Sequence, residues 1–229
     1  MPYSTIPYAE KKFMKKIIAC AVAAALVGAS GASYAQLGGL TSLVGGGSKS
    51  DSSVDLSGQQ AALVKNYVAA NVDVLNANAK MGEALGLKTQ AEQAAAVVSQ
   101  LSSGSTQDKD SASKAVNAVG DTSGAIAAKL KEKPVLDDAS KKTFAQGLGH
   151  LALGMVHYAG MRNDVTSMGN NMKSASPMAL TSLGGAAYVV SNFPGSVTEA
   201  GKALKNAIDF ARSNGIEVPS DATKALAAL

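Results

Sequence analysis

The residue types best suited to bind a metal gather in one methionine-rich segment of this chain. His157, Met161, Asp164 and Met168 follow one another at steps of four, three and four residues, which places them along one side of a helix. Thioether and imidazole groups are ligands that suit Cu(I). Methionine also fills irregular gaps that glycine leaves in a core. Packing is therefore the first interpretation of this pattern, and a copper site on this helix face is the second.

The two histidines of the chain, His150 and His157, are seven residues apart. Two helical turns separate them by ~10 Å along the axis, too far to share one metal ion directly. They belong to a polar line that borders an apolar stripe of the same helix. We interpret this line as the boundary between a buried and a solvated face.

Catalysis has little support in the sequence. The motifs of serine hydrolases, P-loop proteins, dinucleotide-binding proteins and zinc proteases are absent. Acidic residues such as Asp137, Asp138, Asp164 and Glu199 lie among lysines and asparagines, where helix caps and solvated faces are expected. No nucleophile and base can be paired by spacing. We expect a protein that is not an enzyme and has no cofactor.

Residues 14–35 have the layout of a bacterial secretory signal peptide. Two lysines follow Met14, residues 17–27 are apolar, and Ser33-Tyr34-Ala35 forms a small-x-small cleavage site. We predict cleavage between Ala35 and Gln36, and export to the periplasm, the cell surface or the medium. Residues 1–13 contribute nothing that a signal peptide needs, so we interpret them as an upstream extension that is not native.

Two other interpretations of this segment are weaker. Cys20 follows a sequence that fits a lipoprotein cleavage box, but only three residues separate it from the lysines. A retained anchor would need about 20 apolar residues, and the run from 17 to 27 is much shorter.

Export changes what the composition implies. Four of the 21 basic and one of the 17 acidic residues precede the cleavage site, so the mature chain has 17 and 16, a net charge of +1. This balance gives no electrostatic reason to bind nucleic acid or an anionic membrane. The single cysteine, Cys20, is removed with the leader, so packing alone must hold the mature fold.

The mature sequence predicts an all-α fold: a flexible Gly/Ser-rich spacer at 36–57, then a single bundle of five or six helices at 58–229. We expect Ser57 to cap the first helix and Pro194 to start the last long one. Helical periodicity or helix end signals predict that this first helix ends near 82–86. They predict further helices at 88–101, 112–131, 138–173, 178–192, 194–214 and 220–229.

The segment 138–173 has the clearest pattern. Two stripes of seven-residue period lie three positions apart, the layout of a helix that packs along its length. We expect both stripes to be buried: Phe144, Leu151, Tyr158, Val165 and Met172 in the first, and Gly147, Gly154, Met161 and Met168 in the second.

Two long segments, 144–161 and 174–198, carry no charged residue. We interpret them as a central hairpin wrapped by more polar helices. The alternative is a membrane-inserting hairpin, although neither segment has the apolar density of a span.

The sequence thus favours an exported, non-catalytic protein that binds an unidentified protein partner or an apolar ligand, or acts structurally. A lipid- or membrane-active protein that uses the 144–198 hairpin, and a periplasmic copper-handling protein, are the alternatives.

Overall fold

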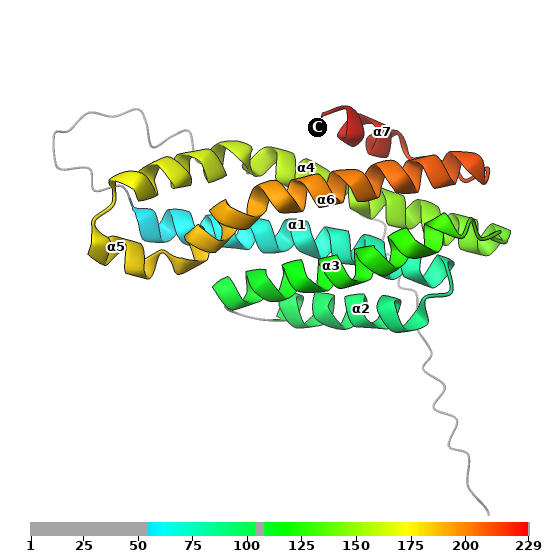
Figure 1. The fold of residues 1–229 in the computed structure, drawn as a ribbon, viewed down its shortest axis with the longest axis horizontal. Helices are drawn as coiled ribbons and strands as arrows, with labels where there is room; N and C mark the ends of the chain where they lie inside the picture. Colours follow the sequence, from blue (N-terminus) through cyan, green and yellow to red (C-terminus); the bar gives the residue numbers. More distant parts are fainter. Residues whose placement is uncertain (1–54, 104–107, 229) are drawn as a thin grey trace, which may run out of the picture. The chain divides into compact units, whose positions relative to one another are not determined.

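The computed structural model describes residues 55–103 and 108–228, and their fold is all-α (Figure 1). This part of the chain contains no strand and has seven helices rather than the expected five or six. The predicted extension, signal peptide and nearly all of the spacer lie outside the described residues. The helices are α1 (Leu56–Ala84), α2 (Lys88–Ser103), α3 (Lys109–Lys131), α4 (Asp138–Ser174), α5 (Pro177–Ser182), α6 (Gly184–Ser213) and α7 (Ser220–Ala227).

Helix α1 is the central element, and it packs against α2, α3, α4 and α6 (Figure 1). It begins one residue before the predicted cap, Ser57. Asp55 caps it instead, by accepting a hydrogen bond from the Gly58 N–H at 2.9 Å. A carboxylate at this position satisfies a free N–H group and lies favourably at the positive end of the helix dipole.

The two predicted stripes of α4 are confirmed. All their residues are buried except Met172, which packs against the core while partly exposed. Most of this face packs against α1. The tilted ring pair of Tyr67 and Tyr158, with centroids 6.1 Å apart, joins the two helices.

Two glycines of α4 allow the backbones of α1 and α4 to approach closely. A Cβ atom at Gly147 would lie 3.1 Å from the Ala77 carbonyl oxygen and 2.7 Å from Met81 Cγ. At Gly154 it would lie 2.9 Å from Val74 Cγ2. Any side chain at either position would push the helices apart, because packed interiors have little free volume.

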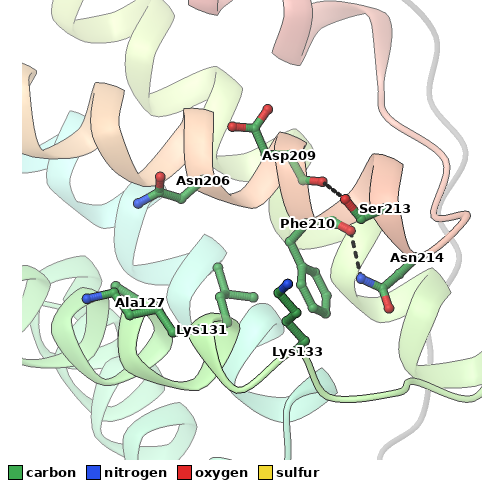
Figure 2. Close-up of a pocket in the computed structure, with 9 residues that line it drawn as sticks. Ala127, Lys131, Lys133, Asn206, Asp209, Phe210, Ser213 and Asn214 are labelled. Carbon is green, nitrogen blue, oxygen red and sulfur yellow. Dashed lines mark hydrogen bonds between the residues drawn. The ribbon is translucent and has the colours of Figure 1, made fainter.

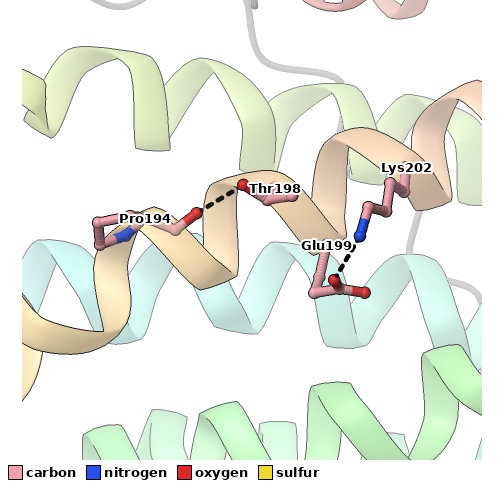
Figure 3. A network of polar contacts seen from close by, with 4 residues as sticks. All are labelled: Pro194, Thr198, Glu199 and Lys202. Carbon is pink, nitrogen blue, oxygen red and sulfur yellow. Dashed lines mark hydrogen bonds and ion pairs between the residues drawn. The ribbon is translucent and has the colours of Figure 1, made fainter.

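Helix α6 runs through Pro194, so the prediction that a new helix starts there is wrong. Pro194 lacks an N–H group and removes one helical hydrogen bond. The helix nevertheless continues, because Val189 and Phe193 before it and Leu204 after it are all buried. Thr198 Oγ1 donates a hydrogen bond to the Pro194 carbonyl oxygen at 2.8 Å, and Glu199 and Lys202 form an ion pair further along (Figure 3).

The chain breaks ten residues earlier than predicted, between α5 and α6. Leu183 is buried at this point, and Gln60 of α1 bridges the break. Its amide nitrogen donates to the Ser182 carbonyl at 3.1 Å, and its oxygen accepts from the Ala186 N–H at 3.0 Å. A side chain from a distant helix thus satisfies the backbone groups that the break leaves free.

The expected central hairpin is observed only in part: Tyr158 of α4 packs against Phe193 of α6, with ring centroids 5.9 Å apart, but α1 takes the central position. The uncharged segment 174–198 comprises the end of α4, all of α5 and the first half of α6. Helix α5 has no buried residue, and Met178 is 84% exposed. Helix α1 is the central element, and α4 and α6 pack their apolar faces against it. This packing explains why parts of α4 and α6 carry no charge. Among the described helices, none combines the length and apolar character needed to cross a membrane.

Candidate functional site

A groove with a volume of about 420 Å³ lies between the C-terminal parts of α3 and α6 (Figure 2). It exists because the last turns of the two helices lie side by side without closing the space between them. The lining residues combine apolar, amide and charged side chains: Ala127, Leu130, Lys131, Lys133, Asn206, Asp209, Phe210, Ser213 and Asn214.

The floor of the groove is apolar. Leu130 packs partly buried against the core, and Phe210 is 7% exposed. The Phe210 ring rests on Phe144 of α4, with centroids 5.2 Å apart. A second, much smaller cavity of about 20 Å³ shares Leu130 and extends toward Met81 of α1. The groove therefore offers a bound molecule a hydrophobic surface that the protein core supports from below.

The charged groups that line the groove differ in whether they have an ion-pair partner. Asp209 forms an ion pair with Lys205, at 2.7 Å between Nζ and Oδ2. Lys131 and Lys133 form no ion pair with any acidic group of the described residues. The α3 side of the groove thus carries two ammonium groups without a carboxylate partner.

Lys133 adopts an unusual backbone conformation, with φ at +50°. It is the one residue other than glycine with a positive φ within 55–103 and 108–228. Its N–H group donates to the Leu130 carbonyl at 3.1 Å, which closes the last turn of α3. Glycine is the usual residue in this capping position, because a side chain there is sterically strained. Pro134 follows directly and restricts the preceding residue further.

The four residues of the predicted copper face do not converge. Met161 and Met168 are buried in the core, whereas Asp164 is exposed. His157 instead lies against α1, with Nδ1 2.7 Å from Oδ2 of Asp73. No group of three or more His, Cys, Asp or Glu residues in the described part of the chain is arranged to hold a metal ion.

Asp73 is a charged residue in the α1–α4 interface that sequence patterns did not indicate. Burial raises the pKa of its carboxyl group above 3.8, and the nearby His157 and His150 oppose this rise. Its position between the buried Ala70 and Ala77, at i+3 and i−4, is the signal that could have found it. The candidate acid Asp137 has a structural role, because its carboxylate caps α4 by accepting from the Ser140 N–H at 2.7 Å.

Sequence patterns did not indicate the groove residues either. Lys133-Pro134 and Asn214-Gly215 are visible in the sequence as helix ends, but the sequence does not place these two ends side by side. Only the packing of α3 and α6 on α1 does so.

Comparisons with protein-family models, with curated proteins and with solved structures give no match to this chain. Its function must therefore be inferred from the groove and from the chemistry of the side chains that line it.

Proposed function

We propose that this chain is an exported, non-catalytic helical-bundle protein of the bacterial periplasm or cell surface that binds a small apolar ligand. The groove between α3 and α6 is the observation that carries the proposal. Its volume of about 420 Å³ falls within the ~300–1,000 Å³ typical of small-molecule sites. Its apolar floor also matches the usual composition of such sites, although six of its nine lining residues are polar or charged.

The dimensions of the groove favour a small molecule over a partner helix. The lining residues cover less than two turns on the α3 side, from Ala127 to Lys133, and slightly more than two turns of α6, from Asn206 to Ser213. A docked helix presents anchors at i, i+3, i+4 and i+7, and the α3 side of the groove is shorter than that span.

The side chains of the groove also support a binding role without catalysis. Its titratable groups are Lys131, Lys133 and Asp209, and the carboxylate of Asp209 is engaged by Lys205. Ser213 has the only hydroxyl group in the lining, and its Oγ donates to the Asp209 carbonyl at 2.9 Å. No base lies next to it among the lining residues, so the arrangement lacks an activated nucleophile.

The binding proposal is tested by filling the groove. Ala127→Leu places extra atoms in it, and Ala128→Leu is the matched control because Ala128 is exposed on the neighbouring position and does not line the groove. In an NMR titration with 1-octanol, we expect shifts at the groove for the unmodified chain and for Ala128→Leu, and at least a tenfold weaker affinity for Ala127→Leu. Absence of octanol binding to all three proteins would refute the proposal.

The export part of the proposal rests on residues 14–35 and is tested separately. The protein recovered from the periplasm or the medium should have an intact mass that starts at Gln36. Recovery of a chain that retains Lys15 and Lys16, or that carries an acylated Cys20, would contradict it.

A membrane-active protein is the second candidate, and helix α5 is the observation that favours it. Met178 and Leu180 are 84% and 40% exposed there, in a segment without charge. Exposed apolar groups of this kind can enter a lipid interface. Dye release from liposomes by the mature chain, lost in Met178→Ser, would support this candidate. Absence of release supports the first.

A further inference from the structure

We infer that the groove between α3 and α6 selects amphipathic anions, namely medium-chain carboxylates, and that Lys133 is the residue that recognises their charge. This inference rests on the proposed binding function and specifies its ligand. It follows from three features of the groove: the sign of its unpaired charge, the conformation of Lys133 and the apolar floor.

The charge of the groove is positive on the side that faces the ligand. Figure 2 shows Lys133 extending from the end of α3 toward Phe210, whereas the Asp209 carboxylate points away from α3. Asp209 forms an ion pair with Lys205 on the same helix. Lys129, the other lysine near the end of α3, pairs with Glu132 at 2.6 Å, so the charges of Lys131 and Lys133 remain uncompensated. An anion in the groove would meet two cations and no free carboxylate.

The dipole of α3 favours a cation at Lys131, which lies in the last turn of the helix, whereas Lys133 lies beyond its end. Cations are favoured near the C-terminus of a helix, where free carbonyl groups carry partial negative charge. The end of α6 that faces the groove is already capped: Asn214 Nδ2 donates to the Phe210 carbonyl at 2.9 Å, and the Ile216 N–H donates to the Ala211 carbonyl at 2.9 Å. The carbonyl groups of Phe210 and Ala211 are therefore already hydrogen-bonded within the protein.

The backbone conformation of Lys133 indicates that folding does not require a lysine at this position. A glycine would form the same turn without the strain of a side chain at positive φ. The turn itself therefore gives no reason for a lysine, and strained residues that the fold tolerates often belong to binding sites. What the lysine adds is an ammonium group at the mouth of an apolar groove.

The rest of the groove determines which anion fits. Leu130, Ala127 and Phe210 offer an apolar surface for a hydrocarbon chain. The cations that line the groove are lysines, which bind an anionic group as point charges and do not require two acceptor atoms in a plane. A single carboxylate on a chain short enough for about 420 Å³ satisfies both conditions.

The experiment compares octanoate with 1-octanol, which share the same chain and differ in charge. NMR titrations use the mature chain, Lys133→Gly, Lys131→Gln and the charge-matched control Lys173→Gln, whose lysine lies at the exposed end of α4. We expect octanoate to bind the unmodified chain and Lys173→Gln at least tenfold more tightly than octanol. Lys133→Gly should lose this preference while its thermal midpoint stays unchanged or rises, and Lys131→Gln should reduce the preference partly.

The outcomes separate this inference from the proposed function. Equal affinity for octanol and octanoate would overturn the anion selectivity. A preference that survives in Lys133→Gly would overturn the role of Lys133 in it. Either result would leave the binding site standing. Binding of neither probe would overturn both. Loss of octanoate preference together with an undiminished thermal midpoint cannot come from unfolding, and it would therefore assign the selectivity to the lysine.

Discussion

Helix α4, at its interface with α1, and helix α3, whose end lines the groove, use glycine in opposite ways. In α4, Gly147 and Gly154 face the backbone of α1, and a Cβ atom at either position would lie within 3 Å of a neighbouring atom. In α3, a Cβ atom at Gly120 or Gly124 would have no such neighbour within 4 Å. Glycine closes the first interface, whereas in α3 it only weakens the helix.

Polar contacts differ between the two regions as well. Helix α3 is joined to α1 by Asn78, whose Nδ2 donates to Thr122 Oγ1 at 2.7 Å and to Ser123 Oγ at 2.9 Å. Buried hydrogen bonds of this kind fix the register of a helix. The α1–α4 interface depends mainly on apolar contact, and its polar contacts include the pair of Asp73 and His157. The comparison indicates that buried hydrogen bonds help to position α3, whereas close backbone approach positions α4.

The largest expected effect is a loss of core packing in α4. Leu151 is fully buried, so Leu151→Ala should lower the free energy of unfolding by about 2–5 kcal/mol. Leu130, at the groove, is only partly buried, and Leu130→Ala should cost roughly 1 kcal/mol. Urea denaturation of both variants measures the difference. Equal costs would show that the groove is as well packed as the α1–α4 interface, and would break the comparison.

Gly147→Ala should have the next largest effect. The new methyl group would lie 3.1 Å from the Ala77 carbonyl oxygen and 3.2 Å from the Met81 nitrogen, both in the backbone of α1. Overpacking of this kind costs about 1–3 kcal/mol, which exceeds the gain in helix propensity. We expect a lower urea midpoint with unchanged helical content by circular dichroism. A more stable variant would mean that α1 and α4 separate easily.

Gly124→Ala is the matched test in α3, with the opposite sign. Its methyl group would enter open space, so the substitution should stabilise the protein by about 0.5–1 kcal/mol through helix propensity. Thermal denaturation should show a higher midpoint than for the unmodified chain. A lower midpoint would indicate that this face of α3 is covered in solution.

The smallest effect concerns the dependence of stability on pH. The pKa of Asp73 is raised in the fold, chiefly by burial, so the folded chain binds this proton more tightly than the unfolded chain. The stabilisation from this group is present at pH values below 3.8, the ordinary pKa of an aspartate. It is lost as the pH rises through the higher pKa that Asp73 has in the folded chain. His150 and His157, which face Asp73, limit this loss.

The difference in unfolding free energy between the unmodified chain and Asp73→Asn isolates that contribution, because the amide does not titrate. This difference should decrease as the pH rises above 3.8. Urea denaturation at several pH values checks it. A difference that increases with pH would mean that the histidines outweigh the cost of burial.

Much of α4 could be predicted from the sequence. The two seven-residue stripes and the bounds 138–173 came from periodicity, and the helix ends only one residue later, at Ser174. Asp137 and Asp138 at its start, and Ser176-Pro177 after it, are strong local signals. Local chemistry determines such boundaries, so they need no knowledge of the neighbouring helices.

The path of α6 could not be predicted in this way. Pro194 is a strong local signal for a helix end, yet burial of Val189, Phe193 and Leu204 on both sides of it outweighs the lost hydrogen bond. The break at Leu183 depends on Gln60, more than 120 residues away in the chain. In both cases tertiary contacts override a local preference.

The sequence by itself determined that this chain folds into helices, where most of them begin and end, and which face of α4 is buried. These properties follow from side-chain periodicity and capping, which act within a few residues. Only the tertiary structure decided that α3 and α6 end side by side, that Lys133 faces a groove, and that His157 lies against Asp73. The physical reason is that these contacts join distant segments through the packing of both helices on α1, and no local pattern encodes them.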